Sequence, residues 1–201
     1  MEDTYRTIET TSEGLFKSRG SRFIAKAYPV ESVEEVKEIL AALRKEYHDA
    51  RHHCYAYRLG PDGVTYRVND DGEPSNSAGK PILGQLQSLD LTNILVVVIR
   101  YFGGVLLGVG GLISAYRTAT RESIEKNTII SKTFDTQVRI VFQYPAMNDV
   151  MHIIKESKAE IVNQDFGLGC EMLVRIRQGA AEALISQLER IEFVEIHISG
   201  Q

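Results

Sequence analysis

The last third of the chain has an order of predicted elements that is compatible with few folds. Beyond residue 132, alternating apolar positions and helical repeats predict the order strand, helix, strand, strand, helix, strand. The predicted strands are TQVRIVFQY, AEIVNQDFG, CEMLVRIRQ and EFVEIHIS, and the helices are PAMNDVMHIIKESK and AAEALISQLER. This β-α-β-β-α-β order is the ferredoxin-like pattern. We therefore expect a ferredoxin-like domain over residues 133–201.

Residues 1–132 are less regular and predict a separate α+β domain. The segments TYRTIETT, RFIAKAYPV, HHCYAYRLG and VTYRVND are typical of strands. Ser32 is expected to cap a helix over VEEVKEILAALRKEY, with Glu35 completing a capping box. A polar loop, DDGEPSNSAGK, leads to a helix that we expect to begin at Pro81. The segment ILVVVIR is apolar on both faces, which predicts a central buried strand.

Composition and charge indicate a cytoplasmic globular protein. A hydrophobic fraction of 43% and a charged fraction of 25% are ordinary globular values, so wholesale disorder is not expected. The net charge of −4 excludes strong non-specific attraction to nucleic acid but leaves a local basic patch open. The start of the chain is polar, and the long apolar stretch from Ile94 to Tyr116 is interrupted by Arg100 and by glycines. We predict neither a signal peptide nor a membrane span.

The two cysteines, Cys54 and Cys170, lie far apart and lack the spacing of a CxxC motif. This argues against a disulfide scaffold and favours a reducing compartment.

A glycine-rich turn separates the predicted central strand from the helix LISAYRTATRESIEK. It holds five glycines within nine residues: Gly103, Gly104, Gly108, Gly110 and Gly111. Each costs conformational entropy on folding, so the local geometry must need positive φ or close backbone approach. A turn that opens a helix also presents free N–H groups and the positive end of the helix dipole, which favour an anion. The spacing matches no nucleotide-binding fingerprint, and tight packing of the helix on the strand is the alternative explanation.

The polar loop gathers three carboxylates within four residues, those of Asp70, Asp71 and Glu73. Such oxygens bind Mg²⁺, and paired carboxylates also act as general acid and base. The alternative is an acidic turn in which Asp71 and Gly72 supply the bend.

The neighbouring residues His52, His53 and Cys54 suggest a zinc site at first sight. On a strand, however, His52 and Cys54 share one face while His53 points away. Structural zinc needs four ligands, and no partner pair is visible, so we expect no metal site and no thiol nucleophile here.

The densest basic run consists of Lys17, Arg19, Arg22 and Lys26, beside Phe16 and Phe23. It is a possible second patch for phosphates with aromatic stacking nearby. An ordinary solvated strand face is the alternative.

Three segments, ARHHCYAYRLG, DDGEPSNSAGKPIL and VVVIRYFGGVLLGVGGLISAYR, resemble in order the motif blocks of the YigZ/IMPACT family. The family forms are close to A-x-H-x-C-x-A-Y, DDGEP-x-x-x-AGKP and RYFGG-x-x-LG-x-GGL-x-x-AY. Besides the five glycines of the turn, these motifs fall on His52, Cys54, Asp70, Asp71, Gly72, Glu73, Pro74, Gly79, Lys80, Arg100 and Tyr101.

The resemblance implies a first domain like the second domain of a small-subunit ribosomal protein, with a left-handed βαβ crossover. It implies that the second domain is similar to the last domain of elongation factor G. It also implies a role in translation, because the eukaryotic relatives regulate translation by binding an activator of the starvation-response kinase.

We therefore expect a non-enzymatic binding protein, without cofactor, that contacts RNA, a ribosome or a translation factor. The predicted anion site combines the glycine turn with Lys80, Arg100 and Arg117. One alternative is a Mg²⁺-dependent enzyme that acts on a phosphorylated small molecule through the acidic loop. Another is a regulator whose protein partner supplies acidic side chains.

Overall fold

The computed structural model describes residues 3–60, 62–167 and 169–199. The chain has a mixed α/β fold and divides into two compact units. One unit is Tyr5–Lys132, and the other runs from Thr133 onward and includes Asp3 and Thr4. That the units are separate domains with a boundary at residues 132 and 133 stays a proposal.

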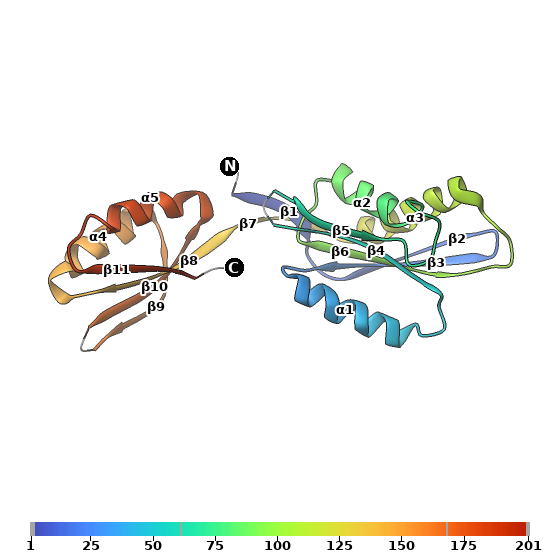
Figure 1. Cartoon of the computed structure of the whole chain (residues 1–201). Helices are drawn as coiled ribbons and strands as arrows, with labels where there is room; N and C mark the ends of the chain where they lie inside the picture. Colours follow the sequence, from blue (N-terminus) through green and yellow to red (C-terminus); the bar gives the residue numbers. More distant parts are fainter. Residues whose placement is uncertain (1–2, 61, 168, 200–201) are drawn as a thin grey trace. The chain divides into compact units, whose positions relative to one another are not determined.

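The first unit contains an antiparallel five-stranded sheet in the order β2-β3-β6-β4-β5. Figure 1 shows α1 on one face of this sheet and α2 and α3 on the other. The elements are β2 (Ser12–Ser18), β3 (Ser21–Pro29), α1 (Val33–Glu46), β4 (His52–Leu59), β5 (Thr65–Asn69), α2 (Gly79–Ser88), β6 (Ile94–Tyr101) and α3 (Gly108–Glu125). A separate two-stranded sheet pairs β1 (Thr4–Ile8) with β7 (Ile129–Thr133).

The central strand β6 divides the core of this unit into two layers. Its side chains alternate between the cluster that contains α2 and α3 and the cluster that contains α1. The cluster with α2 and α3 contains Ile94, Val96 and Val98. The cluster with α1 contains Leu95, Val97 and Ile99, and all six residues are fully buried. Each such burial contributes roughly 1.5–3 kcal/mol before entropy is counted. The prediction of a central strand that is apolar on both faces is confirmed.

Helix α1 joins two strands that are parallel to each other. Both β3 and β4 run antiparallel to β6, which lies between them. At the start of α1 the Ser32 hydroxyl accepts a hydrogen bond from the Glu35 N–H at 3.2 Å. The Glu35 carboxylate accepts from the N–H of Glu31 at 2.8 Å, one residue earlier than in a standard capping box.

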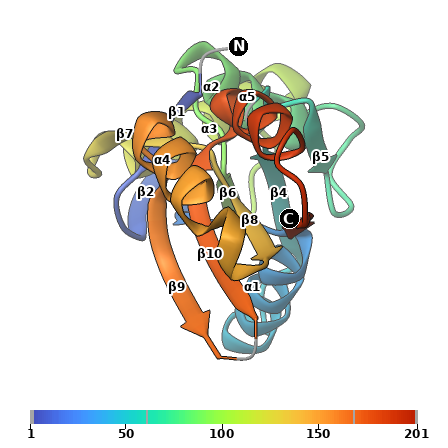
Figure 2. The same cartoon turned by 90° about the vertical axis from the view of Figure 1, so that its left-hand side faces the viewer.

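The second unit has an antiparallel sheet in the order β11-β8-β10-β9. Its elements are β8 (Asp135–Phe142), η1 (Tyr144–Ala146), α4 (Met147–Ser157), β9 (Glu160–Phe166), β10 (Cys170–Arg177), α5 (Gln178–Leu188) and β11 (Val194–Ser199). Helices α4 and α5 lie on one face of the sheet (Figures 1 and 2). This is the element order of the predicted ferredoxin-like pattern. Each unit has its own core with one free, fully buried cysteine, Cys54 in the first and Cys170 in the second.

Several element boundaries differ from those that the sequence predicts. Strands β2 and β7 were not expected, α2 begins two residues before Pro81, and α3 begins at Gly108 rather than 112. Glycine and polar residues interrupt the apolar alternation of β2. There Gly14 packs against the backbone of α3, where a Cβ atom would come within 3.0 Å of Ala119 O. The glycines of the first turn of α3 are poor helix formers, which hides the helix start from a propensity argument.

Among the described residues, no helix is both long enough and apolar enough to cross a membrane.

The glycine turn contains one position at which only glycine fits. A Cβ atom on Gly103 would overlap the backbone of Gly20 and Ser21 in the turn between β2 and β3. We expect Gly103→Ala to lower the free energy of unfolding by about 3 kcal/mol, because two backbone segments must move apart. Urea denaturation measures the change. The matched control is Gly110→Ala, where a Cβ meets nothing within 4 Å. Equal stability of the two variants would contradict the packing.

Candidate functional site

Arg100 does not reach the surface. Its side chain lies on the same face of β6 as Val98, within the layer under α3, and the residue is only 5% exposed. Its Nη1 atom donates to Glu73 Oε1 at 2.7 Å, and the Glu73 side chain is 4% exposed. The expectation that Arg100 offers a free cation to an anion is therefore wrong, since its charge is neutralised by a buried carboxylate.

The buried ion pair continues into a polar network. The Tyr116 hydroxyl on α3 donates to the same Glu73 oxygen at 2.8 Å. The Cys54 thiol on β4 lies 2.9 Å from the Asp70 carbonyl oxygen and 3.2 Å from the Tyr116 hydroxyl oxygen. Burial raises the pKa of the Cys54 thiol far above its ordinary value. Because only a thiolate is a good nucleophile, Cys54 is not suited to nucleophilic catalysis.

Asp70 serves as the cap of helix α2. Its Oδ1 atom accepts hydrogen bonds from the N–H groups of Ala78 and Gly79, at 3.0 and 2.8 Å. Its Oδ2 atom accepts from the N–H of Asn76 at 2.8 Å. The first carboxylate of the acidic loop thus satisfies backbone donors at a helix N-terminus, where a negative charge is favourable.

Asp71 also has partners within the protein. Its Oδ2 atom accepts from the His53 N–H at 2.7 Å, and its Oδ1 atom lies 3.2 Å from Arg44 Nη2. The ring nitrogen Nδ1 of His52 lies 2.9 Å from the carbonyl oxygen of the same aspartate. These contacts favour the structural interpretation of the acidic loop over the Mg²⁺ interpretation. Within residues 3–60, 62–167 and 169–199, no three His, Cys, Asp or Glu side chains are grouped as metal ligands.

His52 and His53 face opposite sides of the sheet. Cys54 contributes to the core under α2 and α3, whereas the neighbour of His53 on the strand β6 is Ile99, which packs against α1. His53 is buried, and its Nε2 atom has no hydrogen-bond partner within the described part of the chain. Burial lowers the pKa of this imidazole, although Asp71 nearby opposes the effect.

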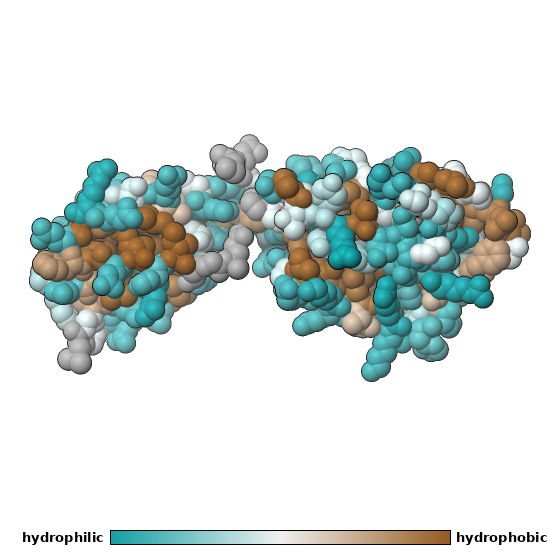
Figure 3. Space-filling view, viewed as in Figure 1, coloured by the Kyte–Doolittle hydropathy of each residue, from teal (hydrophilic) through white to brown (hydrophobic). Residues whose placement is uncertain are grey.

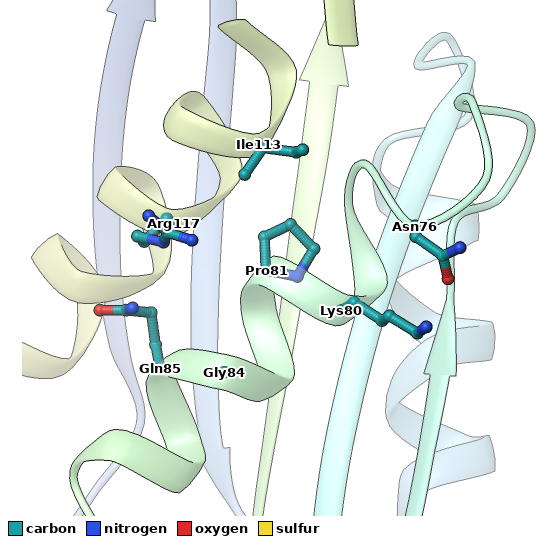
Figure 4. A pocket seen from close by; sticks show the side chains of 7 residues that line it. All are labelled: Asn76, Lys80, Pro81, Gly84, Gln85, Ile113 and Arg117. Carbon is teal, nitrogen blue, oxygen red and sulfur yellow. The ribbon is translucent and has the colours of Figure 1, made fainter. Parts of the chain in front are cut away.

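A groove between α2 and α3 brings together two of the predicted anion-binding residues, Lys80 and Arg117. Its volume is about 420 Å³. The lining consists of Asn76, Lys80, Pro81, Gly84, Gln85, Ile113 and Arg117, with no carboxylate (Figure 4). Both cations are exposed, and neither forms an ion pair with any other described residue. They are the free positive charges that an anion site requires.

The glycines of the turn lie outside the lining of this groove. Gly103 is needed for close packing, and Gly104 and Gly108 adopt positive φ values of 86° and 72°. Helix α3 has no side-chain cap at its first turn, in which Gly110 and Gly111 lie. The structure thus explains three of the five glycines by backbone geometry and does not combine them with Lys80 and Arg117 into one site.

The second basic run is only partly free. Lys17, Arg19 and Arg22 lie at the end of the hairpin formed by β2 and β3 and are exposed. Lys26 instead lies 3.5 Å from a carboxylate oxygen of Glu13 and 3.4 Å from one of Glu46. Its charge is neutralised, so Lys26 does not belong to an anion-binding patch.

Sequence reasoning missed the two amides of the groove and the glycine in its wall. Asn76 and Gln85 carry no charge, and nothing in the sequence pattern marks them as binding residues. Gly84 does carry a signal, because a glycine inside a helix costs roughly 0.5–1 kcal/mol relative to alanine. A Cβ at Gly84 would meet no atom within 4 Å, so the missing side chain leaves the groove open.

Comparison with known proteins places these features in a family. The family described as "Impact N-terminal domain" matches residues 19–124. The chain belongs to the IMPACT family. It is 34% identical to an IMPACT family member of Haemophilus influenzae, over 84% of this chain and 82% of the relative. It is 36% identical to the IMPACT family member YigZ of Escherichia coli, over 73% of this chain and 72% of that protein.

A solved structure also matches the entire chain. The crystal structure of a hypothetical protein superposes with a TM-score of 0.73 at 27% identity and covers all of both chains. The match to the IMPACT family includes both Lys80 and Arg117, since residues 19–124 span the groove.

Breaking the buried ion pair should be costly. Arg100→Leu leaves the Glu73 carboxylate buried without its cation, so we expect the free energy of unfolding to fall by about 3–5 kcal/mol. The double variant Arg100→Leu, Glu73→Leu should be less destabilised, because no uncompensated charge remains. Urea denaturation compares the two. A loss below about 1 kcal/mol for Arg100→Leu, the value typical of exposed pairs, would show that the pair is not buried.

His53 should make stability fall in mild acid. The unfolded chain binds a proton at this residue near pH 6.5, whereas the folded protein resists protonation because its pKa is lowered. The unfolded state then binds more protons, so the free energy of unfolding decreases as pH falls below about 6.5. It stops decreasing once pH passes the lowered folded pKa. Denaturation of wild type and His53→Gln between pH 7.5 and 5 checks this, and identical pH dependence would contradict it.

Proposed function

We propose that this protein is a non-enzymatic binding protein of the translation machinery that holds RNA phosphates in the groove between α2 and α3. The observation that carries the proposal is the pair of unpaired cations, Lys80 and Arg117, in a groove without carboxylates. Phosphate contacts by lysine and arginine dominate the affinity of proteins for nucleic acid. The net charge of −4 for the whole chain restricts such binding to a local patch.

The arrangement of side chains suits a ligand with more than one phosphate. In Figure 4 Gln85 and Arg117 are on the same side of the groove, which both residues line. Lys80 extends to the other side, toward Asn76, and Pro81 and Ile113 lie between the two cations. Positive charge at both sides and an apolar surface between them fit a backbone of phosphates separated by sugars.

Membership of the IMPACT family supports the link to translation, because the eukaryotic relatives regulate translation. The same resemblance supports the finer fold assignment that we propose here. The first unit would match the second domain of a small-subunit ribosomal protein, with a left-handed crossover, and the second unit the last domain of elongation factor G. We propose a cytoplasmic location and a ribosome or ribosomal RNA as the partner.

No specific observation favours the alternative of a Mg²⁺-dependent enzyme. All three carboxylates of the acidic loop already have partners within the protein. Asp70 accepts hydrogen bonds at the start of α2, and Asp71 contacts His53 and Arg44. Glu73 contacts Arg100 and Tyr116. A catalytic or metal-binding carboxylate would have to break these contacts first.

Removal of either cation should weaken RNA binding. We expect Lys80→Ala and Arg117→Ala each to lower the affinity for fragments of ribosomal RNA, and to reduce the slope of log affinity against log salt by about one unit. Fluorescence anisotropy over a series of salt concentrations measures both. The matched controls are Lys37→Ala on α1 and Arg121→Ala on α3, both exposed and outside the groove.

A glycine substitution separates groove access from stability in the same assay. Gly84→Gln places a side chain in the groove and improves helix propensity, so RNA affinity should fall while the melting temperature does not. Wild-type affinity in all three groove variants, or no RNA binding by wild type at low salt, would exclude the proposal. Saturable, salt-insensitive binding of one small phosphorylated metabolite would exclude it in favour of a metabolite site.

A further inference from the structure

A second surface of the first unit is strongly apolar. Four large side chains of the connection after β6 and of the first turn of α3 are at least half exposed: Phe102 at 52%, Val105 at 51%, Leu106 at 80% and Val109 at 53%. These four residues are called the apolar tip below. Figure 3 shows apolar surface at the right-hand end of the view, the end at which Figure 1 places the hairpin of β2 and β3. Clustered exposure of this kind marks an interaction site more often than chance.

The apolar tip is held outward by the backbone. The Gly103 N–H donates to the Ser21 hydroxyl at 3.1 Å, and Gly103 packs on the backbone of Gly20. The Arg19 guanidinium donates to the Leu106 carbonyl oxygen at 3.4 Å. The loop is thus fastened to the β2–β3 hairpin. Its side chains are therefore exposed although the loop itself is held in place.

The hairpin adds positive charge to the edge of the apolar tip. Lys17, Arg19 and Arg22 are exposed, and none forms an ion pair within the described parts of the chain. The Arg22 guanidinium carbon lies 4.8 Å from the centre of the Tyr101 ring, and Tyr101 is the residue before Phe102 in the sequence. No Asp or Glu occurs in residues 14–30 or 91–121. Asp49 carries a carboxylate that accepts a hydrogen bond from the Tyr101 hydroxyl at 2.6 Å.

We propose that the apolar tip and the three cations form a docking site for an acidic amphipathic segment of a partner protein. Leu, Ile or Phe side chains of that segment cover the tip, and its Asp or Glu side chains meet Lys17, Arg19 and Arg22. Such complementarity of charge around an apolar centre is the usual composition of a specific protein interface. The site shares no residue with the groove between α2 and α3, so it stands independently of the RNA proposal.

The composition of the surface disfavours RNA and membranes as occupants. Sequence-tolerant RNA binding relies on aromatic stacking, and three of the four residues of the tip are aliphatic. Anionic membranes are held by clusters of roughly four to eight cations, and only three are present here. The net charge of −4 opposes such a surface further.

A selection experiment with the full chain tests the proposal. A library of random peptides is displayed and panned against the protein at physiological salt, and one selected peptide is synthesised for fluorescence anisotropy. We expect the selected peptides to combine Asp or Glu with Leu, Ile or Phe. Leu106→Asp and Lys17→Glu should each weaken binding of the peptide by about tenfold or more, because a desolvated anchor and a complementary charge are lost. Circular dichroism should be unchanged, since Leu106 is 80% exposed.

Matched controls make equivalent changes elsewhere on the same unit. Val64→Asp replaces another exposed apolar residue, at 69%, and Arg67→Glu reverses another exposed charge. Both should bind the peptide like wild type. Selected peptides without acidic residues, or wild-type binding by Leu106→Asp, would overturn the proposal.

Two further measurements test whether the apolar tip binds a membrane or RNA instead of a protein segment. Flotation with phosphatidylserine-containing vesicles that Leu106→Asp abolishes would overturn the proposal in favour of a membrane. Loss of RNA affinity in Leu106→Asp would assign the tip to RNA. If Leu106→Asp loses peptide binding but keeps its RNA affinity, the apolar tip is a protein-docking site separate from any RNA site. This conclusion does not depend on the result for the groove variants.

Discussion

The buried ion pair between Arg100 and Glu73 is the interaction on which the first unit depends. Removing a carboxylate or a guanidinium from water costs several kcal/mol, so neither group can be buried unless the other is present. The pair joins the central strand to the loop that follows β5, and the Tyr116 hydroxyl adds α3 to the same carboxylate oxygen. One glutamate therefore links three segments that are distant in the sequence.

The position of Glu73 also determines the geometry of the acidic loop around it. With Glu73 fixed, Asp70 reaches the first N–H groups of α2 and Asp71 reaches the backbone of β4. The beginning of α2, and with it Lys80, is placed by this set of bonds. The candidate RNA groove thus rests on a partly buried polar network whose three carboxylates lie outside the groove lining and act as positioning groups.

Much of the fold could be predicted from the sequence because it follows from period and composition. The alternation in β6 and the Ser32 cap are local patterns, each contained in one segment. The ferredoxin-like order follows from a succession of such local patterns along the chain. The burial of Arg100 is not local. It depends on a carboxylate 27 residues earlier in the chain, and a charge at the end of a strand looks the same whether its partner is solvent or Glu73. The glycine turn shows the same limit, since a side chain at position 103 is excluded by the backbone of Gly20, which lies in the β2–β3 hairpin far away in the sequence. The sequence identifies Lys80 as a candidate from its motif position and Arg117 from its place on the helix after the glycine turn. That these two residues line one groove without Arg100 follows only from the packing of α2 beside α3.

The placement of the two cysteines has a consequence for measuring motion in this protein. Each core holds a single thiol, Cys54 in one and Cys170 in the other, and both are shielded from solvent. A thiol reagent needs an exposed thiolate, so its rate of reaction at each cysteine reports how often that core opens. The natural chain therefore carries one chemical reporter per unit. Peptide mapping of the labelled protein would resolve the opening equilibria of the two units separately, without any engineered probe.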